Sequence, residues 1–228
     1  MPRRFAAICA IACLLGAAPP AALAAKPPAS WDGLALIKSK RFDAVYLAPD
    51  ADFSGYRKVM LDPTEVAFRK NWLRDYNSTV TGLSGRLSQK EADEILVRVR
   101  KGFEEIFRTA HVDAGEQVVT EAGPDVLRVR TAVVNLYATS PVEPEGRGYN
   151  FAREAGGATL IIEVRDSTSG ALLGRAVDGK LAGDTGTYLR TDVSNRWDFR
   201  NLFRDWAKIS IEGLRTLQAR TPTTAAAR

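Results

Sequence analysis

The stretch that decides the fold covers residues 158–181 and reads ATLIIEVRDSTSGALLGRAVDGKL. In its first half, apolar side chains alternate with polar ones, which is typical of a β-strand with one buried face. The alternating apolar residues are Leu160, Ile162 and Val164. The following connection, DSTSG at 166–170, is five residues long and ends in glycine, as many hairpin loops do. We therefore predict an antiparallel hairpin with strands at 158–166 and 171–181.

More strands are predicted on the N-terminal side of this hairpin. Short runs of β-branched and aromatic residues, bounded by turn-forming residues, lie at 42–48, 56–61, 116–121 and 126–139. The segment 63–72 is ambiguous, because its apolar residues alternate while Asp62 and Pro63 also form a plausible helix start. Residues 77–87 are predicted to form a loop.

Two long amphipathic helices complete the pattern. Ser88 and Glu91 form a capping box, and apolar residues then recur at spacings of three and four as far as Ala110. The second helix is predicted to begin at an N-cap Asn195 and to bury Trp206 in its apolar stripe. Strands, helix, strands and helix in this order predict an α+β fold. We expect an antiparallel-dominated sheet with both helices packed on one face, as a two-layer sandwich.

The first 25 residues, MPRRFAAICAIACLLGAAPPAALAA, have the basic start, apolar run and small residues of a secretory signal peptide. We expect cleavage after Ala24 or Ala25. The alternative is a lipoprotein, because the sequence AIAC at 10–13 loosely resembles a lipobox and would place an acyl group on Cys13. The apolar run is too short to span a bilayer. We therefore predict a periplasmic or secreted protein without a transmembrane span, with outer-membrane association as the alternative.

The mature chain is predicted to be a single domain over residues 26–220, followed by a disordered tail at 221–228. Over the full 228 residues, 45% are hydrophobic and 26% are charged, which is typical of a globular protein. Removal of Arg3 and Arg4 with the leader lowers the formal net charge from +5 to +3. The basic residues are scattered among acidic ones, so nucleic acid is not an expected partner.

Few residues are available for catalytic chemistry. His111 is the single histidine, and both cysteines lie within the first 13 residues, so we predict neither a metal site nor a cofactor. The sequence DTGT at 184–187 resembles the motif of aspartic proteases, which need two such aspartates, but it occurs once. Asp184 is therefore the candidate for a carboxylate-dependent hydrolase, and a glycine-rich turn is the alternative. No catalytic residue is predicted.

Two features are candidates for binding. Four basic residues recur every fourth position in the C-terminal helix and form one cationic row: Arg196, Arg200, Arg204 and Lys208. This row either docks on an envelope protein or an anionic envelope component, or is a solvated face. Trp72, in the aromatic and basic segment FRKNWLRDY, either lines a ligand groove or packs at the domain edge.

Two segments of the sequence resemble a known family. They are WDGLALIKSKRFDAVYLAPDADFSGYRKVMLDP at 31–63 and AGGATLIIEVRDSTSGALLGRAVD at 155–178. The sequence resembles a bacterial envelope family catalogued as domain of unknown function 3313, over about residues 31–217. Many members look like exported lipoproteins with a clean lipobox, from which this sequence departs at Ala10. The resemblance implies an envelope location and supplies no reaction or ligand. We expect a non-enzymatic periplasmic binding or interaction domain; the alternatives are a small hydrolase and a lipid-anchored assembly subunit.

Overall fold

The structure is a computed structural model that describes residues 26–80, 85–138, 151–152, 154–183, 188–189 and 191–219. Four predictions fall outside these residues. They are the signal peptide with its cleavage residues Ala24 and Ala25, the acylation of Cys13, the hydrolase candidate Asp184, and the disordered tail at 221–228. Each of them stays a prediction.

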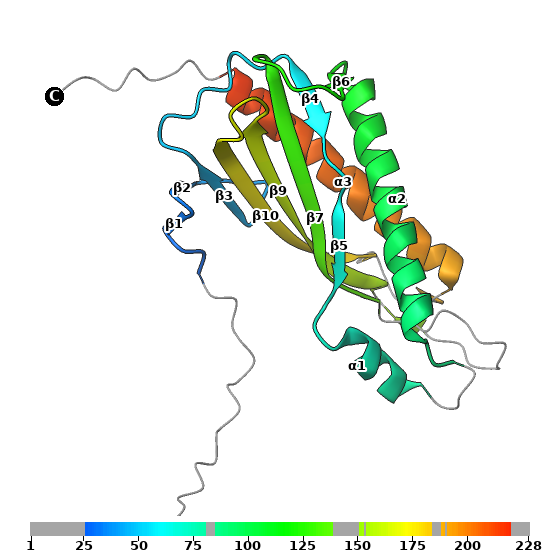
Figure 1. Cartoon of the computed structure of the whole chain (residues 1–228). Coiled ribbons are helices and arrows are strands. Elements are labelled where there is room, and N and C mark those ends of the chain that lie inside the picture. The colour runs from blue at the N-terminus through cyan, green and yellow to red at the C-terminus, as the bar shows by residue number, and fades with distance from the viewer. Residues whose placement is uncertain are drawn as a thin grey trace, which may run out of the picture.

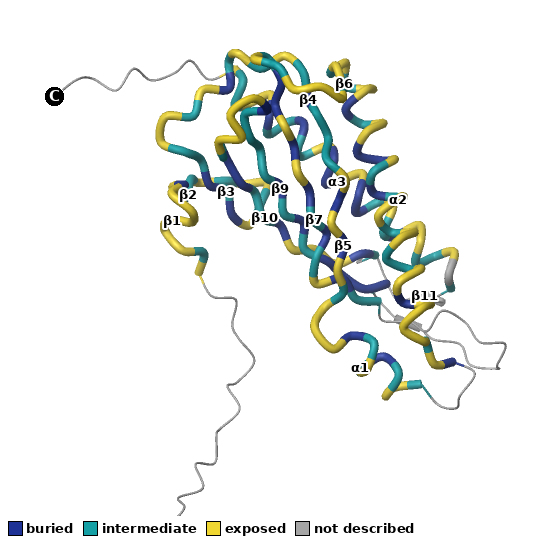
Figure 2. The backbone as a smooth tube through the Cα atoms, in the orientation of Figure 1, coloured by how far each residue is buried: buried dark blue, intermediate teal, exposed yellow. Residues whose placement is uncertain are grey.

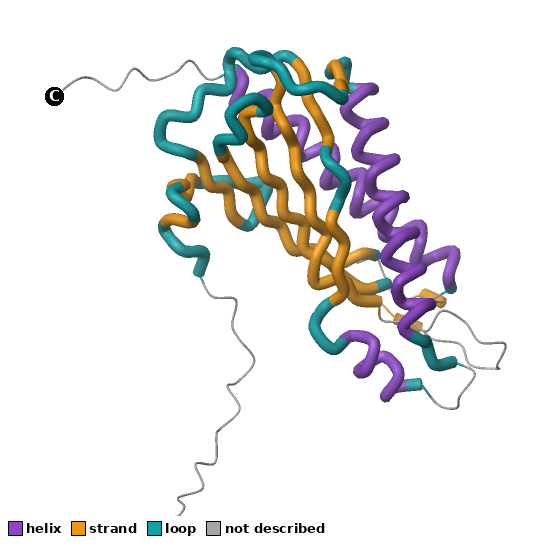
Figure 3. The backbone as a smooth tube through the Cα atoms, in the orientation of Figure 1, coloured by secondary structure: helices purple, strands orange, loops and turns teal. Residues whose placement is uncertain are grey.

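Among the described residues, nine strands form one mostly antiparallel sheet in the order β1-β2-β3-β10-β9-β7-β4-β6, and β5 pairs with β7 (Figure 1). The strands are β1 (Ser30–Trp31), β2 (Leu34–Ile37), β3 (Ala44–Leu47), β4 (Lys58–Leu61), β5 (Glu65–Phe68), β6 (Gln117–Val119), β7 (Val126–Ala138), β9 (Gly156–Asp166) and β10 (Leu172–Ala182). Two short strands, β8 (Phe151–Ala152) and β11 (Tyr188–Leu189), pair separately. Helices α2 and α3 pack against the large sheet, on the same side (Figure 3). The predicted α+β fold is confirmed.

The predicted hairpin is the centre of the sheet. Strands β9 and β10 pair antiparallel along most of their length, and β7 pairs antiparallel with the other edge of β9. Leu160 and Ile162 of β9 are buried, as the alternating pattern requires. Three strand pairs are parallel: β4 with β6, β4 with β7, and β5 with β7. Helix α2 follows β5 and returns the chain to the end of the sheet where β4 begins, so β6 and β7 run in the same direction as β4 and β5.

Of the two alternatives for residues 63–72, the structure has the strand, and the helix start at Asp62 and Pro63 is wrong. Strand β5 ends at Phe68, and helix α1 (Trp72–Thr79) begins a few residues later. Asn71 separates them, because its left-handed backbone, with φ of 63°, ends the extended chain before the helix starts. The prediction of a loop from residue 77 is therefore wrong for the last turn of α1. The short strands β1 and β2 are additions to the predicted pattern.

The long helices are α2 (Gln89–Asp113) and α3 (Asp192–Gln218). The predicted capping box of α2 is confirmed, since the Ser88 and Glu91 side chains each pair with the other residue's backbone N–H. The predicted N-cap of α3 is wrong. Thr191 caps this helix in a reciprocal arrangement with Ser194, so Asn195 lies inside the first turn. The earlier start arises because threonine and serine offer the same capping chemistry as asparagine.

The core lies between the sheet and the two long helices, where the buried residues gather (Figure 2). The helices run side by side in the same direction: Phe103 packs edge-on against Phe203, and Arg215 near the end of α3 donates to the carbonyl oxygen of Ala114 at the end of α2. Trp206 is fully buried, as predicted. No helix in the described part of the chain is long and apolar enough to cross a membrane.

Candidate ligand pocket

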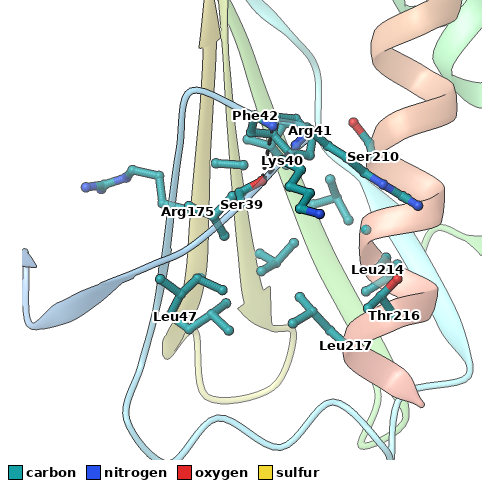
Figure 4. Close-up of a pocket in the computed structure, with 18 of the residues that line it drawn as sticks. Ser39, Lys40, Arg41, Phe42, Leu47, Arg175, Ser210, Leu214, Thr216 and Leu217 are labelled. Atoms are coloured by element: carbon teal, nitrogen blue, oxygen red, sulfur yellow. Dashed lines mark hydrogen bonds between the residues drawn. The ribbon is translucent and has the colours of Figure 1, made fainter. Parts of the chain in front are cut away.

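A largely apolar pocket of about 270 Å³ lies between the C-terminal half of α3 and the strands β3, β9 and β10. Leu47 on the sheet side and Leu214 and Leu217 on the helix side point toward the same space (Figure 4). Further apolar walls are formed by Phe42, Val45, Phe107, Val129, Ile162, Val164 and Ala176. These residues come from several segments that are far apart in the chain, so the pocket exists only in the folded protein.

Small residues on both walls keep this space open. On the helix wall, Ser210 and Gly213 replace the larger side chains of the apolar stripe. A β-carbon built on Gly213 would lie 3.7 Å from Cε2 of Phe42, which is ordinary van der Waals contact. On the sheet wall, a β-carbon built on Gly174 would lie 2.8 Å from Cδ2 of Leu47 and 3.2 Å from Cγ2 of Val164, so a side chain there would displace Leu47. Gly213 therefore accepts a methyl group, whereas a larger side chain would enter the pocket.

The mouth of the pocket is bordered by residues 38–42, which connect β2 to β3. Ser39 shapes this connection, because its Oγ accepts hydrogen bonds from the backbone N–H groups of Arg41 and Phe42, both at 3.1 Å. Arg41 reaches across to α3 and pairs with Glu212, with 2.9 Å between Nη1 and Oε2. Lys38 and Lys40 are exposed and form no ion pair within the described chain. The mouth therefore carries two uncompensated positive charges.

A buried histidine also lines the pocket. His111 lies in the last turn of α2 and is only 2% exposed. Its Nδ1 lies 2.5 Å from Oε2 of Glu116, whereas its Nε2 is buried and has no hydrogen-bond partner. The sequence did not indicate this pair, because Glu116 follows the end of the helix and shares no helical face with His111.

Arg175 contributes its backbone to the pocket, while its side chain points away from it (Figure 4). The guanidinium pairs with Glu163 at 2.5 Å and with Asp32 at 2.8 Å, and it lies over the ring of Trp31. Burial alone would lower the pKa of Arg175, but these two carboxylates offset it and leave that pKa raised. Burial would likewise raise the pKa of Glu163, which the hydrogen bonds from Arg175 and from Arg165 lower instead. This network fastens β1 to the sheet.

The predicted binding residues lie elsewhere. Trp72 is buried and stacks on Phe68 with 3.9 Å between ring centroids, in a cluster around α1. Three residues of the cationic row, Arg200, Arg204 and Lys208, line a groove of about 550 Å³ between α2 and α3. Arg196 is exposed on α3 but does not line this groove. The structure thus brings together three of the four row residues and separates Trp72 from them.

The residues of the pocket mouth were not predicted from the sequence. The run KSKR at 38–41 could have indicated them, because it places three basic residues between two apolar segments. Among the residues that the structure describes, no group of three or more His, Cys, Asp or Glu side chains is placed to hold a metal ion. The pocket is a cavity with apolar walls, one buried imidazole and a basic mouth.

Residues 28–209 match the family model described as protein of unknown function (DUF3313), and the chain belongs to this family. A comparison with curated proteins gave no significant match. The chain is similar to a PelC dodecamer from Paraburkholderia phytofirmans, with 11% sequence identity and a TM-score of 0.34 over 78% of this chain and 98% of that one. It is also similar to the DUF330 protein XCC0632 from Xanthomonas campestris, with 12% identity and a TM-score of 0.35 over 75% of this chain and 91% of that one. A third similar structure is a putative neuraminyllactose-binding hemagglutinin homolog from Helicobacter pylori, with 12% identity and a TM-score of 0.33 over 75% of this chain and 87% of that one.

Proposed function

We propose that this protein is a non-enzymatic binding protein of the bacterial envelope, which holds the hydrocarbon chain of an anionic amphiphile in the pocket between α3 and the sheet. The observation that carries the proposal is an apolar cavity beneath a mouth with two lysines that form no ion pair in the described chain. Apolar walls take up a hydrocarbon chain, because each buried methylene group contributes about 0.8 kcal/mol. The charges of Lys38 and Lys40 fit a carboxylate, phosphate or sulfate head group at the mouth.

The size of the cavity supports a single chain. Pockets for small molecules have volumes of roughly 300–1,000 Å³, and this one, at about 270 Å³, lies just below that range. The predicted signal peptide supports an envelope location, where amphiphiles are abundant. The alternatives of a hydrolase and of a lipid-anchored subunit rest on Asp184 and Cys13, which both lie outside the described residues.

Calorimetric titration with straight-chain carboxylates, kept below their micelle concentrations, tests the proposal. We expect one molecule of dodecanoate to bind per chain. Affinity should rise about fourfold for each methylene group from octanoate upward, until the pocket is full. The double variant Lys38→Gln and Lys40→Gln should weaken the binding of dodecanoate and leave that of uncharged dodecanol unchanged. A lack of saturable binding, or an affinity independent of chain length, would refute the proposal.

We also propose a second function for the cationic row, as a surface that approaches anionic membranes. In the described chain, Arg200, Arg204 and Lys208 form no salt bridge, although Glu105 and Asp113 of α2 line the opposite wall of their groove. Trp197, on the same helix, is 59% exposed, and exposed tryptophan is enriched at membrane interfaces. Each basic residue near an anionic surface contributes up to about 1 kcal/mol, which salt weakens.

The triple variant Arg200→Gln, Arg204→Gln and Lys208→Gln is therefore expected to lose most binding to phosphatidylglycerol vesicles at low salt. Vesicle co-sedimentation measures this loss, and circular dichroism should show an unchanged fold. A matched control changes Lys90, Arg98 and Lys101 on α2 to glutamine, which removes the same charge from another helix. Equal losses in both triple variants would show that net charge, and not the row, determines the binding.

A further inference from the structure

The ligand pocket shares two residues with a second cavity. This second cavity is a cleft of about 220 Å³ between α2 and the strands β4 and β7. Phe107 of α2 and Val129 of β7 line both the cleft and the ligand pocket. Both side chains are buried. The two cavities are therefore neighbours with a common boundary inside the protein.

The register of the sheet places both cavities over one continuous floor. The strands β3, β10, β9, β7 and β4 are neighbours in this order. Directly paired residues form a single row across these strands: Leu47, Gly174, Val164, Val129 and Leu61. The first four line the ligand pocket, and the last two line the cleft. Because neighbouring strands lie about 4.8 Å apart, the floor of the ligand pocket runs about 14 Å from β3 to β7 before it reaches the cleft.

Phe107 lies where the two cavities meet. Whereas Val129 belongs to the floor, Phe107 comes from the helix layer above it. Its ring packs against Phe103, with 5.2 Å between ring centroids, and against His111, with 4.8 Å. A side chain that lines both cavities above a common floor separates them. The ring of Phe107 therefore closes the ligand pocket at the end opposite to β3, where residues 38–42 border the mouth.

The cleft beyond Phe107 contains polar groups that are already paired. The Oγ1 atoms of Thr64 and Thr131 are hydrogen-bonded to each other at 2.8 Å. The backbone N–H of Thr64 donates to Oε1 of Glu104, also at 2.8 Å. A hydrocarbon chain that enters the cleft over Leu61 breaks neither of these hydrogen bonds, so it leaves no polar group there without a partner.

We infer that Phe107 is a specificity-determining residue, which sets the longest hydrocarbon chain that the ligand pocket accommodates. This inference rests on the proposed function and names the chain-length class of its ligand. A chain that enters at the mouth runs along the floor toward β7, and its end meets the ring of Phe107. Methylene groups beyond this length find no apolar space in the pocket and add no affinity.

The test measures the affinity of straight-chain carboxylates from octanoate to hexadecanoate, below their micelle concentrations, for the wild-type protein and for Phe107→Ala. For the wild type, affinity should rise about fourfold for each methylene group up to a limiting length and then level off. In Phe107→Ala the limiting length should increase by at least two methylene groups, because the ring no longer separates the cavities. A carboxylate two methylene groups beyond the wild-type limit should then bind about fifteenfold more tightly to the variant than to the wild type.

Phe103→Ala is the matched control. Phe103 is also buried and packs against Phe107, but it lines neither cavity. Its truncation removes the same ring from the core and should leave the limiting length unchanged. Phe107→Leu shortens the side chain less and should increase the limiting length by about one methylene group. It provides the same readout where Phe107→Ala does not fold.

The possible failures are distinct. If carboxylates bind but the limiting length is the same in the wild type and in the Phe107 variants, the inference is wrong and the proposed function stands. The same conclusion follows if affinity for the wild type still rises at hexadecanoate, or if Phe103→Ala increases the limiting length as much as Phe107→Ala does. If no carboxylate binds to the wild type, the proposed function fails, and the inference fails with it.

Discussion

Replacing Trp206 with alanine is expected to lower the free energy of unfolding by about 3–5 kcal/mol, the usual range for truncating a large buried aromatic side chain. Trp206 is fully buried and stacks near Phe203 in the middle of the core. Its Nε1 also donates to Oδ2 of Asp178, at 2.8 Å. The substitution therefore opens a cavity and removes a hydrogen bond from an almost completely buried carboxylate.

Urea denaturation followed by circular dichroism measures this loss. Trp197→Ala is the matched control, because Trp197 lies on the same helix and is 59% exposed, so its removal should change the stability by less than about 0.5 kcal/mol. Trp206→Phe keeps most of the packing and removes the hydrogen bond, so it should lie between the two. If Trp206→Ala were as stable as Trp197→Ala, α3 would not pack on the sheet as described.

The variant Gly213→Phe is expected to abolish binding of dodecanoate. Gly213 lies on the wall that α3 contributes to the pocket, and a β-carbon at this position would contact only Cε2 of Phe42, at 3.7 Å. The ring of a phenylalanine here extends into the cavity and takes the volume that the hydrocarbon chain needs. Calorimetric titration of the variant measures the loss.

Gly213→Ala is the matched control for this variant. A methyl group makes ordinary contact with Phe42, so dodecanoate should bind nearly as well as to the wild-type protein. Alanine also raises helix stability relative to glycine by up to about 1 kcal/mol, so this variant should unfold at a higher urea concentration. Wild-type affinity in Gly213→Phe would place the ligand outside this pocket.

The regular parts of the fold were predictable because local periodicity determines them. The alternation in β9, the glycine that ends its connection to β10, and the capping box at Ser88 each act within a few residues. The start of α3 was missed because Thr191 and Asn195 are both good N-caps, and the structure selects the earlier one. Strand β1 was missed because it is only two residues long.

The pocket was not predictable, because it forms where segments that are far apart in the sequence come close together in space. Lys40, Leu47, Gly174 and Leu217 meet only after β3 pairs with β10 and α3 packs across the sheet. Sequence patterns also could not show that Arg175 turns to the opposite face, or that Nε2 of His111 is left without a partner. The cationic row, in contrast, was visible, because a helical period places its residues on one face.

The most direct measurement locates a bound chain by isotope-filtered nuclear Overhauser effects. Unlabelled dodecanoate is added to protein with ¹³C-labelled methyl groups, and contacts from the ligand's methylene protons are recorded. We expect contacts with the methyl groups of Leu47, Leu214 and Leu217, which point toward the pocket from its two walls (Figure 4). Contacts instead with Ile106 and Ile211, which line the groove between α2 and α3, or no contacts at all, would contradict the proposed site.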